Sequence, residues 1–266
     1  MPELPEAEVA RKSLTPCVAG KTIREVLVGR RQSIRTPLQD DVTFALALRR
    51  RTIKSIERQA KALVFHLDDG SALIFHFKLG ASVRCGNERL ADTGGVALNF
   101  TDGSSLEFAD LALSEFHVAA SEDLARLPVL KEGADPLSRS LTAAKLRKLL
   151  PKNRQIKAAL TDQETIGGIG NTYSDEILWN ARISPFRKVS DLTGAQWDEL
   201  TRQIKATLRE GIRDGGEEGF TDARGRHGCY HTRVHKREGE PCPRDGHPIE
   251  MVKKGRKTFW CPQCQV

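Results

Sequence analysis

The first six residues, Met1-Pro2-Glu3-Leu4-Pro5-Glu6, combine the residue types of an amine nucleophile and its acid–base partners. Removal of Met1, which a small second residue favours, would leave Pro2 with a free secondary amine. The pKa of an α-amino group lies near ~7.7–8.0, so a useful fraction is unprotonated at neutral pH. Attack on a sugar aldehyde carbon would give an iminium ion, and Glu3 and Glu6 could move the protons. Met-Pro starts and acidic first helical turns are also common in proteins without such catalysis. A catalytic role for this segment therefore depends on what the other segments indicate.

The second group of reactive residues is a cluster of possible metal ligands in the last 25 residues. Two short Cys-Pro segments, 242–245 and 261–264, bracket a strand-like stretch, which is the two-knuckle layout of a zinc β-hairpin. Where a four-cysteine site needs its second thiolate the chain has Asp245, and His247 follows two residues later. Both side chains can bind zinc, so a Cys3Asp and a Cys3His site stay open, beside a finger that has lost its metal. We predict one structural zinc ion, with the ligands Cys242, Asp245, Cys261 and Cys264.

A third candidate is a glycine-rich turn, residues 163–171, which runs into a helix that Asn171 is expected to cap. Such a turn lets a phosphate approach the backbone closely, and the following helix adds its positive end. Lys157, one helix earlier, could add a point charge to the same phosphate. Arg256, in the basic turn of the C-terminal hairpin, would offer another. The alternative for the glycine-rich turn is a plain interhelical loop.

These candidates need an α+β scaffold to hold them. The segment 5–14 predicts a helix with acids in its first turn and bases in its last, and its positive end would lower the amine pKa of Pro2. Residues 22–120 give short strand-like runs separated by turns at 68–70 and 102–103, which predicts an antiparallel β-sandwich. After a linker at 131–136, helical spacing returns in segments 141–150, 154–162, 171–181 and 195–212.

We therefore expect three domains: a catalytic β-sandwich with a flanking helix (1–134), a helix–two-turn–helix domain (135–234) and a zinc β-hairpin (235–266). Lys plus Arg number 42 against 35 Asp plus Glu, and the net charge of +7 suits a polyanionic partner such as nucleic acid. The sequence shows neither an apolar run long enough to span a membrane nor a signal peptide, which predicts a cytoplasmic protein. Cys17 and Cys85, which stand alone, are expected to be buried small hydrophobes.

Together these segments resemble the formamidopyrimidine-DNA glycosylase and endonuclease VIII family of base-excision repair enzymes, with the formamidopyrimidine branch closer. The resemblance covers essentially the whole chain. The segments that carry it are MPELPEAE at the start, RQAK at 58–61, HFKLG at 76–80, DQETIGGIGNTYSDEILW at 162–179, REGEPCPRDG at 237–246 and GRKTFWCPQCQ at 255–265. The first segment and GIGNTYSDE are the most specific of these.

The resemblance implies a reaction and a set of roles. Pro2 would be the nucleophile at C1′, Glu3 the general acid or base at the sugar ring oxygen, and Glu6 a support for that network. Lys61 would contact the phosphate or the lesion. Base removal would be followed by β- and δ-elimination. The residues that would contact DNA are Lys157, Asn171, Arg256, Leu79 and His76.

Two departures from the family pattern concern the opening of the duplex. The segment 76–80 has Leu79 in place of the family's methionine wedge, and leucine is a workable wedge. The family's Asp-Pro-Arg-Arg-Phe-Gly loop is replaced by residues 110–116, which lack the arginine that pairs with the orphaned cytosine. The aromatic wedge is absent as well, unless Phe116 takes its place. Discrimination of the opposite base should therefore be weak or different.

The leading expectation is a monomeric bifunctional DNA glycosylase and AP lyase that acts on double-stranded DNA with damaged or abasic sites. In a bacterium it would be associated with the nucleoid. The main alternative is a noncatalytic or lyase-only protein that binds abasic, gapped or branched DNA, and a weaker one is a zinc-dependent regulator. The sequence does not identify the preferred lesion or opposite base.

Overall fold

The computed structural model describes residues 1–35 and 40–266 and, of Lys254, the backbone alone. The chain forms two compact units. The first comprises Met1–Lys131 together with Glu218–Gly228, and the second comprises Glu132–Glu217 together with Cys229–Val266. None of the helices in the described residues is both long and apolar enough to cross a membrane.

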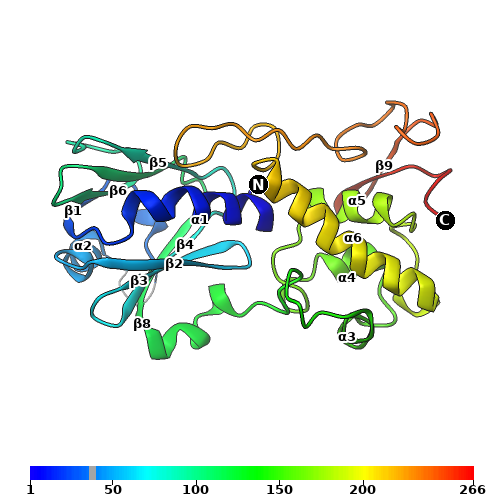
Figure 1. Cartoon of the computed structure of the whole chain (residues 1–266), viewed down its shortest axis with the longest axis horizontal. Helices are drawn as coiled ribbons and strands as arrows, with labels where there is room; N and C mark the ends of the chain where they lie inside the picture. Colours follow the sequence, from blue (N-terminus) through cyan, green and yellow to red (C-terminus); the bar gives the residue numbers. More distant parts are fainter. Residues whose placement is uncertain (36–39) are drawn as a thin grey trace. The chain divides into compact units, whose positions relative to one another are not determined.

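The N-terminal unit is built from two four-stranded antiparallel sheets, with strand orders β1-β6-β7-β5 and β2-β3-β4-β8 (Figure 1). Its elements are α1 (Leu4–Val18), β1 (Ile23–Val28), η1 (Arg31–Ser33), α2 (Asp41–Leu48), β2 (Ile53–Gln59), β3 (Ala62–Leu67), β4 (Ser71–His76), β5 (Ser82–Gly86), β6 (Val96–Phe100), β7 (Ser105–Ala109), β8 (Glu115–Ala120), η2 (Ser121–Arg126) and η3 (Pro128–Leu130). The α+β class and the antiparallel sheets agree with the prediction.

The turns predicted at 68–70 and 102–103 connect β3 with β4 and β6 with β7. Gly70 (φ +80°) and Gly103 (φ +89°) adopt the left-handed conformation that glycine tolerates best. Helix α2 and strands β5 and β8 were not predicted. Cys17 and Cys85 are partly rather than fully buried, and they pack against the main core.

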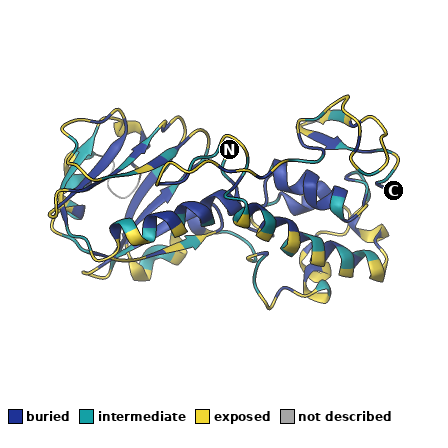
Figure 2. Cartoon of the chain, turned by 45° about the horizontal axis from the view of Figure 1, so that its top comes forward, coloured by how far each residue is buried: buried dark blue, intermediate teal, exposed yellow. Residues whose placement is uncertain are grey.

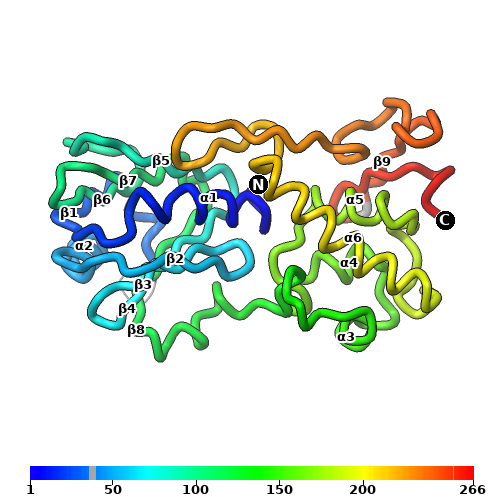
Figure 3. The backbone as a smooth tube through the Cα atoms, in the orientation of Figure 1, coloured from blue at the N-terminus to red at the C-terminus, as the bar shows by residue number. Residues whose placement is uncertain are grey.

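The segment Glu218–Gly228 lies against the N-terminal unit although both its neighbours in sequence belong to the other unit. In Figure 3 this orange part of the tube runs beside β5. The carbonyl of Ala223 accepts the N–H of Cys85 at 2.8 Å, and its own N–H donates to the Ser13 hydroxyl on α1 at 3.2 Å. Ala223 is fully buried in the main core. The boundaries predicted at 134 and 234 do not include this return and stay a prediction.

The C-terminal unit is helical and ends in a two-stranded hairpin. Its elements are α3 (Ala143–Leu149), α4 (Ile156–Leu160), α5 (Asn171–Asn180), η4 (Val189–Asp191), α6 (Gly194–Arg213), β9 (Glu250–Lys254) and β10 (Arg256–Trp260). Helix α5 is buried from Thr172 to Trp179, whereas α6 keeps one exposed face (Figure 2). The buried helix α5 is therefore at the centre of this unit.

Candidate functional site

The N-terminal carboxylates are fixed by the first turn of α1. Glu3 is the N-cap residue, and its N–H donates to Glu6 Oε2 at 2.8 Å. The Glu3 side chain in turn accepts the backbone N–H of Glu6, which completes a capping box. Only 2% of Glu3 and 3% of Glu6 are exposed, whereas Pro2 is half-buried. Two oriented carboxylates therefore lie within four residues of the potential amine.

Lys61 and His76 lie at the same end of the hairpins formed by β2, β3 and β4. Lys61 follows Ala60 in the β2–β3 turn and is 6% exposed, and the next residue, Ala62, pairs with His76. Burial, followed by the positive charges of Lys78 and Lys61 and by His117, lowers the pKa of His76 to about 3. The neutral ring accepts the Lys78 N–H through Nδ1 at 3.1 Å, which leaves the ring proton on Nε2.

Two leucines are exposed on neighbouring turns of the N-terminal unit. Leu79, between β4 and β5, is 51% exposed, and Leu113, between β7 and β8, is 60% exposed. The two turns adjoin, because a Cβ added to Gly80 would lie 3.4 Å from the Asp110 carbonyl oxygen and 4.0 Å from the Ala112 Cβ. Exposed leucines on adjoining turns are a suitable apolar surface for contact with DNA bases.

Phe116 does not belong to this exposed surface. It lies in β8, is fully buried, and its ring contacts Phe75 and Phe108 at centroid distances of 4.9 and 5.1 Å. The idea that Phe116 supplies the aromatic wedge is therefore wrong, because the side chain belongs to the core between the sheets. Leu113, which the sequence did not single out, is the large apolar residue of this loop that is exposed.

The glycine-rich turn before α5 is shaped by the side chain of Gln163. Its Nε2 donates to the carbonyls of Thr161 and Ile169 at 2.9 and 2.7 Å, and its Oε1 accepts the N–H of Gly168 at 3.0 Å. Gly168 has φ +96°, which explains the need for glycine there. The sequence placed Gln163 at the start of the turn but did not indicate this role.

Asn171 begins α5 but does not cap it. The N-cap residue is Gly170, which has no side chain with which to cap the helix. Asn171 Oδ1 is buried and has no hydrogen-bond partner among the described residues. A half-turn of the amide about χ2 would put Nδ2 in that place, since the two atoms are assigned from their surroundings. The amide therefore has polar capacity left at the positive end of α5.

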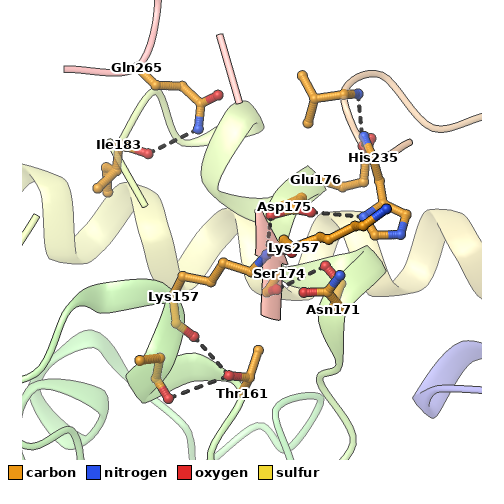
Figure 4. A network of polar contacts seen from close by, with 12 residues as sticks. Lys157, Thr161, Asn171, Ser174, Asp175, Glu176, Ile183, His235, Lys257 and Gln265 are labelled. Atoms are coloured by element: carbon orange, nitrogen blue, oxygen red, sulfur yellow. Dashed lines mark hydrogen bonds and ion pairs between the residues drawn. The ribbon is translucent and has the colours of Figure 1, made fainter. Parts of the chain in front are cut away.

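Lys157 is not an exposed cation. Its ammonium lies 2.6 Å from Asp175 Oδ1 and donates to the backbone carbonyl of Lys257 at 2.9 Å. The other oxygen of Asp175 lies 2.8 Å from His235 Nδ1. Figure 4 shows these contacts converging on α5. Lys157 thus belongs to a buried network of charged groups, which a helical pattern in the sequence does not reveal.

The neighbouring residue, Glu176, attaches the segment before the hairpin to α5. It is fully buried and accepts the backbone N–H groups of Arg233, Val234 and His235 at 2.8 to 3.0 Å. Burial raises the pKa of Glu176, although the three N–H donors act in the opposite direction. Asp175 and Glu176 are buried charged residues that sequence reasoning passed over; their signal was two adjacent acids directly before the apolar residues 177–179 of the helix.

The predicted metal ligands gather at the base of the C-terminal hairpin. One ligand atom from each of Cys242, Asp245, Cys261 and Cys264 lies within 4.8 Å of all the others, and His247 is not in this cluster. Tetrahedral zinc with Zn–S bonds of ~2.3 Å separates its sulfurs by about 3.8 Å. The sulfurs of Cys242 and Cys264 are 3.9 Å apart, and Cys261 Sγ lies 3.4 Å from Asp245 Oδ2. The residues therefore fit one structural zinc ion.

Two donors next to the cluster favour thiolate sulfur. The Trp179 indole N–H donates to Cys242 Sγ at 3.4 Å, and the Arg244 guanidinium donates to Cys264 Sγ at 3.3 Å. Burial opposes ionisation of Cys242, but the indole and two backbone N–H groups lower its pKa below the usual value. Arg244 also lies over the Trp179 ring at 4.0 Å. Thus α5 supports the metal cluster as well as the charged network.

Arg256 is exposed at the first position of β10, after Gly255 with φ +77°. Lys257, the next residue, pairs with Lys253 across the hairpin. The described structure thus gives Arg256 a fixed backbone and an accessible guanidinium, as a phosphate contact requires.

Comparison with known proteins gives matches along nearly the whole chain. Residues 1–112 match the model of the formamidopyrimidine-DNA glycosylase N-terminal domain, 133–222 the formamidopyrimidine-DNA glycosylase H2TH domain, and 239–266 a zinc finger found in FPG and IleRS. Formamidopyrimidine-DNA glycosylases of Geobacillus kaustophilus and Bacillus licheniformis are each 38% identical over 275 residues. They cover 100% of this chain, and the match spans 100% and 99% of their own lengths.

Solved structures agree with this result. A complex of the Lactococcus lactis Fpg with DNA that contains an abasic site has a TM-score of 0.89 and 28% identity, with 99% of both chains covered. The MutM (Fpg) protein of Thermus thermophilus has a TM-score of 0.86 and 32% identity, and 99% of this chain and 98% of that chain are covered.

Proposed function

Because this chain belongs to the formamidopyrimidine-DNA glycosylase family, we propose that it is a DNA repair glycosylase with AP lyase activity. Its substrate is double-stranded DNA with oxidised or ring-opened bases or abasic sites, as in the structures of relatives bound to damaged DNA. Because its substrate would be chromosomal DNA, we expect the protein to act in the cytoplasm, and at the nucleoid in a bacterium. The observation that carries the proposal is the capping box that holds Glu3 and Glu6 beside Pro2.

The proposed reaction begins with the secondary amine of Pro2, exposed when Met1 is removed. The amine nitrogen forms a bond to C1′ and loses its proton, and the bond from C1′ to the damaged base breaks with its electron pair going to the base, which takes up a proton. Glu3 donates a proton to the ring oxygen as the sugar opens. The resulting iminium acidifies the C2′ proton, whose removal expels the 3′ phosphate. Glu6 acts by holding the backbone N–H of Glu3.

We assign the remaining residues of the N-terminal unit to the flipped nucleotide and the gap it leaves. Lys61 contacts the phosphate or the lesion. His76 donates Nε2–H to a phosphate, because Nδ1 is already an acceptor for the Lys78 N–H. Leu79 enters the base stack, where an exposed apolar side chain can act as a wedge.

In the C-terminal unit, Asn171 and Arg256 bind phosphates. Asn171 lies at the positive end of α5 with a side-chain oxygen position that no described residue satisfies, and the Arg256 guanidinium is exposed. Zinc held by Cys242, Asp245, Cys261 and Cys264 would close the base of the hairpin that carries Arg256, and it takes no part in the reaction.

Borohydride trapping tests the proposal. The native protein should form a covalent adduct with an abasic duplex, and Pro2→Gly should form much less. Pro5→Ala is the matched control, because it changes a proline of the same segment but leaves the secondary amine of Pro2. Absence of an adduct with the native protein, or an undiminished adduct with Pro2→Gly, contradicts the assignment.

A noncatalytic or lyase-only protein that binds abasic, gapped or branched DNA is the second candidate. Burial of Phe116 favours it, since the loop of residues 110–116 then offers no aromatic side chain to fill the gap in the stack. Cleavage of duplexes with 8-oxoguanine, ring-opened guanine, an oxidised pyrimidine or an abasic site, each against different opposite bases, separates the two. Tight binding without base removal on any duplex would favour the second candidate.

A further inference from the structure

One buried carboxylate in the C-terminal unit is shared by a lysine and a histidine side chain from distant segments. Asp175 on α5 pairs through Oδ1 with Lys157 of α4, at 2.6 Å, and through Oδ2 with His235, at 2.8 Å. The exposed fractions of the three side chains are 7% for Lys157, none for Asp175 and 5% for His235. Buried charges persist when each has a partner, so this triad is a single unit.

The triad also holds strand β10 at two positions. The Lys157 ammonium donates to the backbone carbonyl of Lys257 at 2.9 Å. The ring of His235 packs edge-on against Phe259, with centroids 5.1 Å apart and planes at 75°. Lys257 and Phe259 are two residues apart on one strand. Figure 4 shows Lys157, Asp175, His235 and Lys257 drawn together around α5.

Arg256 directly precedes the first of these attachment points. It is exposed, and the residue before it, Gly255, has the left-handed φ of +77°. Gly255 makes the turn before Arg256. On the other side of Arg256, the backbone is attached to β9 by strand pairing and to Lys157 by the hydrogen bond to the Lys257 carbonyl. The direction of the Arg256 side chain therefore depends in part on this hydrogen bond.

We propose that the triad Lys157–Asp175–His235 is a positioning device, which fixes β10 so that Arg256 meets a DNA phosphate, and that Lys157 contacts no phosphate itself. This inference rests on the proposed function for the identity of the ligand. It replaces the direct contact expected of Lys157 from the sequence. A direct contact would draw the ammonium away from Asp175 and leave that buried carboxylate short of a partner.

Salt dependence of binding distinguishes a positioning residue from a phosphate ligand. Each phosphate contact that is lost reduces the slope of log K against log salt by about 0.9. Arg256→Ala should weaken binding to an abasic duplex by roughly tenfold to a hundredfold, as expected for a lost charge-assisted hydrogen bond, and should reduce the slope by about 0.9. Lys157→Met should weaken binding by the same factor or less and should reduce the slope by no more than Arg256→Ala does, because the phosphate contact that it weakens is that of Arg256.

The double variant Lys157→Met/Arg256→Ala completes a double-mutant cycle for DNA binding. If Lys157 acts through Arg256, the double variant binds about as weakly as Arg256→Ala alone. A slope reduced by about 1.8 in the double variant, twice the value for one contact, or losses that multiply independently, would overturn the proposal.

A measurement without DNA keeps the inference separate from the proposed function. Hydrogen exchange of the β10 amides should be faster in Lys157→Met and in Asp175→Asn than in the native protein, and unchanged in Arg256→Ala. Lys157→Met/Asp175→Asn removes both charges, so it leaves no unpaired buried ion if a single variant does not fold. Circular dichroism and zinc content confirm folding. If the native protein fails to bind an abasic duplex, the proposed function is wrong. Unchanged hydrogen exchange of the β10 amides in Lys157→Met, in Asp175→Asn and in Lys157→Met/Asp175→Asn would refute the positioning role of the triad.

Discussion

Replacement of Phe116 by alanine tests which residue of the loop 110–116 belongs to the core and which faces outward. Phe116 is fully buried. The centroid of its ring lies 6.0, 4.9 and 5.1 Å from the ring centroids of Phe44, Phe75 and Phe108. Truncation of a buried phenylalanine costs about 3–5 kcal/mol. Each aromatic pair adds about 0.5–1.5 kcal/mol, so we expect a loss near the upper end, about 4–5 kcal/mol.

Urea unfolding followed by circular dichroism and by a probe of the N-terminal unit measures this loss. Leu113→Ala is the matched control from the same loop. Since Leu113 is 60% exposed, its truncation should change stability by no more than about 0.5 kcal/mol. Base removal from a lesion duplex should fall in Leu113→Ala at unchanged stability. If Phe116→Ala kept native stability but lost activity, the placement of Phe116 in the core would be refuted.

Three further predictions concern the other parts of the site. Asp245→Ala should lose bound zinc to a chelator faster than the native protein, and Asp245→Cys more slowly; equal zinc retention by Asp245→Ala would exclude Asp245 as a ligand. His76 has its pKa lowered to about 3 by burial and nearby charges, so the unfolded chain, with an ordinary His pKa near ~6.5, takes up a proton first as the pH falls. Stability should therefore decline between about pH 6.5 and pH 3, by at most about 1.4 kcal/mol per pH unit from this group, and less steeply in His76→Gln. Gln163→Ala removes the three hydrogen bonds that shape the glycine-rich turn and should cost about 1–3 kcal/mol in thermal unfolding; an unchanged Tm would show that the turn holds its shape without them.

Local patterns in the sequence predicted the regular elements well where a strand or helix has a strong period. The four helices of the C-terminal unit and the hairpins turning at Gly70 and Gly103 are present. Helix α2 was missed because its apolar residues run almost continuously and leave no clear helical period. Strand β8 was missed because Phe116 stood in the segment that takes the place of a family loop, and burial by distant rings is invisible in one sequence.

The residues of the candidate site also differ in how far their surroundings could be predicted from the sequence. The metal cluster could be predicted because its spacing is local, and exposure of Leu79 and Arg256 follows from their positions in turns. The environment of Lys157 could not, since its partners are Asp175, 18 residues away, and Lys257, 100 residues away. Whether a lysine faces solvent or a buried carboxylate is decided by tertiary packing.

The location of the covalent adduct tests the central claim most directly. After borohydride trapping with an abasic duplex, proteolysis and mass spectrometry should find the sugar remnant on the N-terminal nitrogen of a peptide that begins at Pro2. An adduct on a lysine such as Lys61, or a mature chain that still begins with Met1, would contradict the assignment of the Pro2 amine as nucleophile.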